Sequence, residues 1–224
     1  MSTAPSAAAL RWREAVMTFH DAADGQLEWV GGAPVPAPVR VVPYDDAWPA
    51  QFERVATAIR TALGGAALAV EHVGSTSVPG LHAKPVIDVD LTVGDPANEA
   101  AYVPALEAVG YMLRIREPGW HEHRALMRRD ATDVPQVNLH VFGPGCPETE
   151  RHQMFRDWLR AHPSDRDEYR DAKLAAASAT GEQLVMNYNK HKEPTIRRLY
   201  ARMFRAAGWL DGAEPCSSEP KEQA

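Results

Sequence analysis

The segment from Glu71 to Thr92, with the sequence EHVGSTSVPGLHAKPVIDVDLT, constrains the fold more than any other part of the chain. An apolar run at residues 66–70 leads into the small-residue turn Gly74-Ser75-Thr76, and a second apolar run carries Asp88 and Asp90. Strand residues i and i+2 point to the same face, so the two carboxylates should lie side by side, about 7 Å apart along the strand. The segment therefore predicts two strands around a turn, with one acidic face.

Two carboxylates on a largely apolar strand need a cation between them. Like charges repel one another and lose hydration when half-buried, so each is driven neutral without a counter-charge. Mg²⁺, or Mn²⁺ in its place, suits carboxylate ligands and is usually held together with substrate phosphates. The sequence thus predicts a metal site at Asp88 and Asp90. It also predicts phosphate binding by Gly74, Ser75 and Thr76, with Lys84 as a neutralising cation.

Composition sets the class of protein. A chain of 224 residues with 45% hydrophobic content can form one well-packed domain without disulfides or structural metals. A net charge of −6 and a pI near 5.8 argue against binding long nucleic acids by bulk electrostatics. Cys146 and Cys216 match no metal or redox spacing, as expected in a reducing cytosol. With no signal peptide and no window long enough to span a bilayer, we expect a cytoplasmic protein with no membrane partner.

Apolar periodicity and turn signals divide the rest of the chain. The predicted helices cover residues 7–23, 48–63, 96–109 and three segments from residue 148 onward. Further predicted strands cover residues 39–42, 111–115, 123–127 and 136–142. The helix over residues 48–63 should have Asp45 or Asp46 as its N-cap. Its apolar face, which should pack on the sheet, comprises Trp48, Phe52, Val55 and Ile59.

Three regions are predicted along the chain. Residues 1–38 form an N-terminal extension with one helix and a Pro-rich linker. Residues 39–210 form the folded domain, and residues 211–224 have too little apolar content to fold and are expected to be disordered.

The order of Gly74-Ser75, the spacing to Asp88 and the pattern Asp88-x-Asp90 resemble the signature of the nucleotidyltransferase superfamily. The longer string EHVGSTSVPGLHAKPVIDVDL, with PYDDAWPAQFERV before it and NLHVF after it, resembles the GrpB family, a domain also found fused to dephospho-CoA kinase in some bacteria. The resemblance runs from about Val39 to Gly208. It implies an α+β fold, in which a nucleotidyltransferase-like mixed β-sheet has flanking helices and a C-terminal helical segment.

In proteins of the superfamily that this chain resembles, a third carboxylate usually sits on a later strand beside the first pair. The comparable strand here, residues 136–142, places Asn138, His140 and Phe142 on one face and offers His140 at that point. His140 could act as a general base on an acceptor hydroxyl, because its unperturbed pKa lies near 6.5. The alternative is a structural histidine that is hydrogen-bonded under the sheet.

Further cations are candidates for phosphate binding. Arg124 and Arg128, with Arg129 beside them, could bind phosphate, although arginines on an edge strand are also ordinary solubility devices. Two helical pairs, each with a tyrosine four residues before a lysine, place a phenol and an ammonium on one helix face. They are Tyr169 with Lys173 and Tyr188 with Lys192. Both resemble pairs in GrpB-like chains and could contact base or phosphate, and a solvated helix face explains them equally.

A zinc site is an alternative to the magnesium site. His121 and His123 alternate on a predicted strand, and His140 would supply a third imidazole, the ligand set of some catalytic zinc sites. The two aspartates offer the better site for a hard metal.

The leading hypothesis is a Mg²⁺-dependent nucleotidyltransferase that moves a nucleoside monophosphate from an NTP, ATP first, to a small-molecule acceptor. A hypothesis from another class is a nucleotide-binding or phosphorylated-ligand-binding module that assists a partner enzyme. A third is an enzyme that uses ATP to activate a carboxylate as an adenylate and pass it to an amine.

Overall fold

The computed structural model describes residues 5–19, 27–33, 38–129, 135–180 and 185–210. The predicted tail over residues 211–224 and most of the Pro-rich linker, residues 34–37, lie outside the described residues. The division of the chain into an extension and a folded domain stays a prediction. No helix within the described ranges is both long and apolar enough to cross a bilayer.

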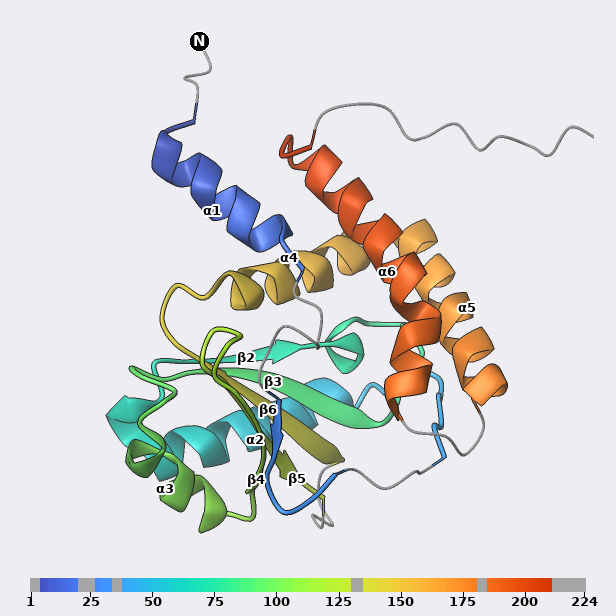
Figure 1. The fold of residues 1–224 in the computed structure, drawn as a ribbon. Helices are drawn as coiled ribbons and strands as arrows, with labels where there is room; N and C mark the ends of the chain where they lie inside the picture. The colour runs from blue at the N-terminus through green and yellow to red at the C-terminus, as the bar shows by residue number, and fades with distance from the viewer. Residues whose placement is uncertain (1–4, 20–26, 34–37, 130–134, 181–184, 211–224) are drawn as a thin grey trace, which may run out of the picture.

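A mixed sheet, with six strands over the described residues, forms the centre of the fold (Figure 1). Its strands are β1 (Glu28–Trp29), β2 (Ala69–Val73), β3 (Val86–Thr92), β4 (Met112–Glu117), β5 (His123–Arg128) and β6 (Gln136–Phe142). They lie in the order β1-β4-β5-β6-β3-β2. β3 and β6 run parallel, and the other neighbouring pairs run antiparallel. The predicted α+β fold with a mixed sheet and flanking helices is confirmed.

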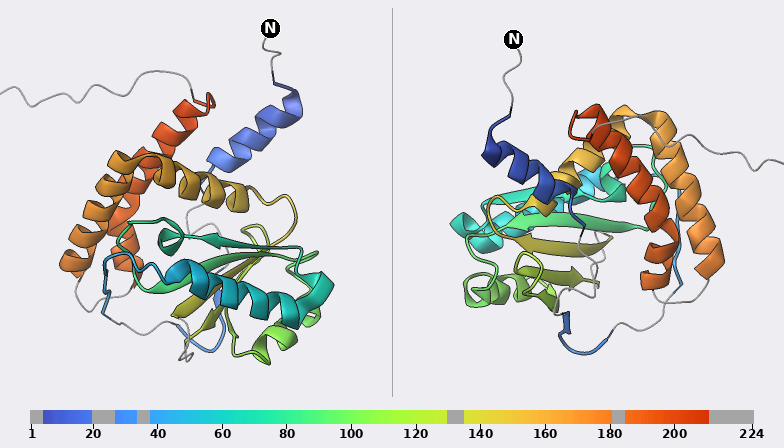
Figure 2. Two further views of the ribbon diagram at one scale, coloured as in Figure 1. Left: turned by 180° about the vertical axis from the view of Figure 1, so that it is seen from behind. Right: turned by 45° about the horizontal axis from the view of Figure 1, so that its top comes forward.

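One face of the sheet is apolar and is covered by α2 (Trp48–Leu63) and α3 (Val103–Glu107) (Figure 2). Alternate residues of β3 and β6 have no exposed area and point to this face: Ile87, Val89, Leu91, Val137, Leu139 and Val141. The predicted packing face of α2 is confirmed, because Trp48, Phe52, Val55 and Ile59 are all buried in the same apolar cluster. The main core therefore lies on this side of the sheet.

The opposite face carries polar side chains and is approached by α4 (Pro147–Ala161), α5 (Pro163–Thr180) and α6 (Val185–Ala206). Figure 1 shows α4 passing over β2, with α5 and α6 side by side at one end of the sheet. These helices share an apolar cluster with the segment between β2 and β3. The buried residues of this cluster are Val78, Leu81, Leu159, Tyr169 and Leu199. The cluster fixes the C-terminal helices beside the turn that follows β2.

In the part of the chain that the structure describes, one helix and one strand of the N-terminal region pack on the rest of the fold. Helix α1 (Ala7–Met17) packs against α4, Val16 is fully buried, and Arg151 donates hydrogen bonds to the carbonyl oxygens of Val16 (3.0 Å) and Thr18 (2.5 Å). The helix was predicted to reach residue 23, but it ends at Met17, because Thr18 is extended with φ −78° and ψ 125°. Residues 20–23 lie outside the described residues. β1 adds an edge strand beside β4, which the sequence did not predict.

Three other predicted features differ from the structure. Residues 39–42 form only an isolated bridge between Val42 and Ala83. The Asp45 side chain accepts a hydrogen bond from the Ala47 amide at 2.8 Å, but the N-cap of α2 is Ala47, without a side-chain cap. The helix predicted over residues 96–109 is split into η3 (Glu99–Ala101) and α3. The physical reason is Pro104, which lacks the N–H that a continuous helix needs and is best accommodated in a first turn, where it lies in α3.

Candidate functional site

Strand register places the two aspartates on the polar face of the sheet. Ile87 points into the apolar core with no exposed area, so the alternating Asp88 and Asp90 point to the opposite face. The parallel pairing of β3 with β6 puts Asn138 beside Asp88 and His140 beside Asp90. Two carboxylates, an amide and an imidazole therefore form one patch. We call these four residues the acidic face.

One oxygen of the Asp88 carboxylate is held by the protein. Asn138 Nδ2 donates to Asp88 Oδ1 at 2.8 Å, and Arg129 Nη2 donates to Asn138 Oδ1 at 3.1 Å. The other oxygen, Oδ2, faces Gly74, where an added Cβ would lie only 2.3 Å away. Gly74 has φ 67° and ψ −168°, a conformation essentially restricted to glycine. Glycine thus allows the turn backbone to lie directly against the carboxylate.

Asp90 is 2% exposed and is also held through one oxygen. Its Oδ2 lies 2.9 Å from His152 Nδ1 in α4. Burial lowers the pKa of His152, but the charge of Asp90 and this hydrogen bond outweigh burial, so the pKa lies above its ordinary value of 6.5. The buried Oδ1 has no hydrogen-bond partner among the described residues. A buried carboxylate oxygen without a donor is costly, so Oδ1 marks a position for a cation or for a donor from a ligand.

His140 contacts a second histidine, on β5. His123 Nδ1 lies 2.6 Å from Glu117 Oε2, and His123 Nε2 lies 3.1 Å from His140 Nδ1. When a neutral His123 donates Nδ1–H to Glu117, its Nε2 accepts from His140 Nδ1–H, which assigns the free lone pair of His140 to Nε2. Burial, followed by the proximity of His123, lowers the pKa of His140 to about 4. His140 is therefore neutral at pH 7, and it is a weaker base than its unperturbed pKa predicted.

The three turn residues have different surroundings. Thr76 is buried, and its hydroxyl donates to the Val86 carbonyl oxygen at 3.1 Å and lies 3.0 Å from His72 Nε2. Thr76 therefore braces the turn against β3, and the predicted phosphate contact by its hydroxyl does not fit this placement. Ser75 is half-buried and lines a cavity of about 160 Å³ together with Gly74. Other residues of this cavity are His152, Arg156, Phe155, Tyr169 and Tyr200.

The predicted tyrosine and lysine pairs on α5 and α6 come together. Lys173 Nζ lies 5.1 Å from the centre of the Tyr169 ring, and Lys192 Nζ lies 5.0 Å from the centre of the Tyr188 ring. Lys84 Nζ lies 5.3 Å from the same Tyr188 ring. Burial and then Lys192 lower the pKa of Lys84, whereas the charge of the acidic face opposes them. Lys84 and Lys173 therefore lie within electrostatic reach of Asp88.

Arg124 and Arg128 do not reach the acidic face, contrary to the prediction. β5 pairs with β6 so that Arg124 lies opposite Val141 and Arg128 lies opposite Val137, and both valines point into the apolar core. Arg124 Nε donates to Glu99 Oε1 at 2.6 Å. Both arginines consequently lie on the other face of the sheet.

The zinc alternative does not match the structure. His121 lies in the turn before β5 with φ 54°, whereas His123 lies within β5 and contacts His140. In the part of the chain that the structure describes, no group of three or more His, Cys, Asp or Glu side chains is arranged to hold a metal ion. A divalent ion at the acidic face would therefore have two protein carboxylates and would take its other ligands from phosphate and water.

Two residues of this site had no role in the sequence predictions. Asn138 alternates with His140 on β6, so the pattern places it on the correct face but does not indicate that it binds Asp88. His152 lies 62 residues after Asp90 within an amphipathic helix, where no local signal marks it.

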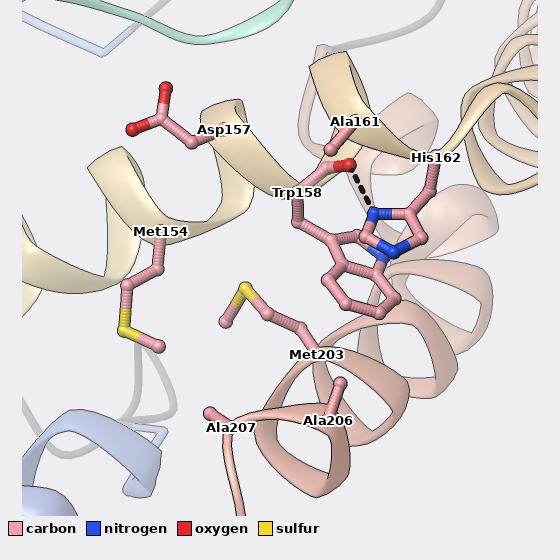
Figure 3. A pocket seen from close by; sticks show the side chains of 8 residues that line it. All are labelled: Met154, Asp157, Trp158, Ala161, His162, Met203, Ala206 and Ala207. Carbon is pink, nitrogen blue, oxygen red and sulfur yellow. Dashed lines mark hydrogen bonds between the residues drawn. The ribbon is translucent and has the colours of Figure 1, made fainter.

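A larger hollow, of about 330 Å³, lies between α4 and α6 (Figure 3). Its lining is mainly apolar and includes Met154, Trp158 and Met203. His162 stacks on the Trp158 ring and donates from Nδ1 to the Trp158 carbonyl oxygen at 2.8 Å. None of the predicted site residues lines this hollow, so it adds no chemistry to the acidic face.

Comparison with known proteins gives consistent matches. A family model of the GrpB protein matches residues 38–202. The UPF0157 protein BH1888 of Halalkalibacterium halodurans is 51% identical over 166 residues, which cover 74% of this chain and 83% of that protein. A dephospho-CoA kinase of Mycolicibacterium paratuberculosis is 33% identical over 227 residues, which cover 89% of this chain and 52% of the kinase. The crystal structure of the conserved protein GrpB from Enterococcus faecalis matches with a TM-score of 0.64 and 28% identity, and the match covers 75% of this chain and 99% of that chain.

Proposed function

Since the chain belongs to the GrpB family, we propose that its acidic face is the active site of a metal-dependent nucleotidyltransferase. The reaction moves a nucleoside monophosphate from an NTP, with ATP as the expected donor, to a small-molecule acceptor. One observation carries the proposal. Asp88 and Asp90 point to one face, and each uses one oxygen for a protein partner, which leaves Asp88 Oδ2 and the unpartnered Asp90 Oδ1 for a cation.

Asp88 and Asp90 are the residues that would hold Mg²⁺ or Mn²⁺. Such an ion, when bound, neutralises charge on the phosphates and polarises the phosphorus–oxygen bonds. The donor set fits, because hard cations prefer carboxylate oxygens and complete their coordination with phosphate oxygens and water. Asn138 and His152 orient the two carboxylates, as outer hydrogen-bond partners commonly do for metal ligands.

Other groups of the chain would bind the phosphates and move the proton. The Gly74-Ser75 turn presents backbone amides and a hydroxyl, and Lys84 supplies a positive charge. In the transfer step the acceptor oxygen bonds to the α-phosphorus, the bond from that phosphorus to the bridging oxygen breaks, and pyrophosphate leaves with the electron pair. The acceptor proton passes to the lone pair on His140 Nε2 and from there to water.

Pyrophosphate release and label transfer test the proposal. The protein is incubated with each of four α-labelled NTPs, Mg²⁺ or Mn²⁺, and a fraction of small metabolites as acceptors. We expect a labelled product that Asp88→Asn abolishes and that Asp46→Asn leaves unchanged, because Asp46 is exposed and lies outside the acidic face. Calorimetry that detects no metal-dependent nucleotide binding, with no labelled product from any NTP, would refute the proposal.

A binding module that assists a partner enzyme is the second candidate. The observation that favours it is the register partner of Asp90, which is a neutral imidazole, His140, instead of a third carboxylate. The match to the kinase is consistent with this candidate, because the chain spans about half of that protein. Tight nucleotide binding that Asp88→Asn weakens, without turnover in any acceptor fraction, would establish the module in place of the enzyme.

A further inference from the structure

Three lysines and two tyrosines from separate parts of the chain converge beside the acidic face. Lys84 precedes β3, Tyr169 and Lys173 lie on α5, and Tyr188 and Lys192 lie on α6. Besides the contacts given above, Lys192 Nζ lies 5.9 Å from the centre of the Tyr169 ring. Each of the three amines therefore lies over at least one of the two rings, and Lys192 lies over both. We call these five residues the lysine cluster.

The deepest members of the lysine cluster have polar atoms without partners. Lys173 is 2% exposed, and its Nζ has no hydrogen-bond partner among the described residues. The Tyr188 hydroxyl is fully buried and equally lacks a partner within that part of the chain. Buried lysines are almost always paired, and ring faces offset only a part of the lost hydration of an ammonium. These donors therefore lack the acceptor oxygens that a ligand would supply.

We propose that the lysine cluster binds the terminal phosphates of a polyphosphate, with inorganic triphosphate or pyrophosphate as the smallest sufficient ligand. The inference rests on the proposed function only in naming an NTP as the source of those phosphates. Phosphate oxygens accept several hydrogen bonds each, which matches the three donors on each ammonium and the Tyr188 hydroxyl. The nearby Asp88 would lie at the other end of the phosphate chain.

Binding should be coupled to proton uptake by Lys173. Burial, followed by the charges of Lys192 and Lys84, holds the pKa of Lys173 well below its ordinary value of 10.5, and Asp88 opposes this effect. An entering polyanion favours the charged amine, so at any pH where part of Lys173 is neutral, binding of the anion is coupled to proton uptake by this amine. Among the described residues, the ionisable groups that face Lys173 or its neighbours are Lys84, Asp88, Arg129, Tyr169, Tyr188 and Lys192.

The test is calorimetry with inorganic triphosphate in EDTA, run in two buffers of different ionisation enthalpy. We expect the wild-type protein to bind triphosphate, with a proton uptake that increases with pH as the free amine of Lys173 loses its proton. Lys173→Met should lower the affinity at least tenfold and abolish the proton uptake, while the melting temperature stays equal or rises, because a buried amine is replaced by an apolar side chain of similar length. Lys190→Met, at an exposed position on α6, should change neither quantity.

Two results would overturn the inference. One is a wild-type protein that binds neither triphosphate nor pyrophosphate. The other is a Lys173→Met variant that melts at a lower temperature and still binds triphosphate normally, which would show that the cluster only stabilises the packing of the helices. If Lys173→Met fails to fold, Tyr188→Phe, which removes only the hydroxyl, repeats the test. The two proposals can fail separately. Triphosphate binding in EDTA without any NTP turnover would support the lysine cluster as a phosphate site and would refute nucleotidyl transfer.

Discussion

Replacing Gly74 by alanine tests the closest approach between backbone and carboxylate in the acidic face. An ideal Cβ at this position would lie 2.3 Å from Asp88 Oδ2 and 2.8 Å from Asp88 Cβ, whereas real Cβ atoms essentially never show contacts under 3.0 Å. Rotation of the carboxylate relieves only the first contact, because Asp88 Cβ is fixed to the backbone of β3. That strand is paired on both sides, with β2 and β6, so it cannot move aside.

The magnitude follows from two terms. A non-glycine residue in the φ and ψ region of Gly74 costs about 1–3 kcal/mol. Displacing the carboxylate breaks its hydrogen bond from Asn138, and a bond to a charged group contributes about 1.5–3 kcal/mol. We therefore expect Gly74→Ala to lower the free energy of unfolding by about 3–6 kcal/mol. In a chain of this size the melting temperature should fall by roughly 6–24 °C, since each kcal/mol shifts it by about 2–4 °C.

Urea unfolding and thermal melting measure this loss, and Gly145→Ala is the matched control. Gly145 has φ 68°, almost the same as Gly74, but an added Cβ there would meet no atom within 4 Å. The control should lose only the cost of left-handed backbone, about 1–2 kcal/mol. Equal losses in the two variants would refute the reasoning, because the contact with Asp88 would then contribute nothing.

The remaining predictions concern stability against pH and the attachment of α1. His72 is buried against Phe52, and burial lowers its pKa to about 4, below the value of 6.5 in the unfolded chain. Neutral His72 therefore makes its full contribution to the free energy of unfolding above about pH 6.5. About 3 kcal/mol of stability is lost as the pH falls towards 4. Between pH 7 and pH 4, the free energy of unfolding measured in urea should fall less in His72→Phe than in the wild-type protein. An equal fall in the two proteins would contradict this assignment. Arg151→Met should destabilise the fold by about 3–5 kcal/mol, because it removes the guanidinium that pairs with the buried Glu148. Limited proteolysis should then release residues 7–17 faster than in the wild-type protein, and an unchanged rate would show that α1 is held by its apolar contacts alone.

Local sequence patterns predict much of the fold. The alternation of apolar and acidic residues predicts β3 with its two faces, and the spacing of Trp48, Phe52, Val55 and Ile59 predicts α2 with its buried side. Such patterns predict strands and helices correctly because the side-chain periods of 2 residues in a strand and 3.6 in a helix depend only on residues close together along the chain. The split of the helix predicted over residues 96–109 shows their limit, since Pro104 and the loop before it decide where the helix begins.

The partners of the acidic residues could not be predicted in this way. β5 carries polar residues on both faces, so its sequence does not indicate which side meets the core, and Arg124 was expected on the wrong one. His152 reaches Asp90 only because α4 packs over the sheet. The lysine cluster likewise depends on how α5 and α6 pack together.

The sequence by itself determined the acidic strand, the glycine turn before it, the α+β class and the resemblance to one family. Only the tertiary structure decided which side chains surround those carboxylates, through the pairing of β3 with β6 and the docking of three helices that lie far along the chain. The physical reason is that a local pattern fixes which face a residue points to, whereas the choice of neighbour depends on contacts between segments distant in sequence. One oxygen of each aspartate and the ammonium of Lys173 have their electrostatic surroundings set by those distant contacts.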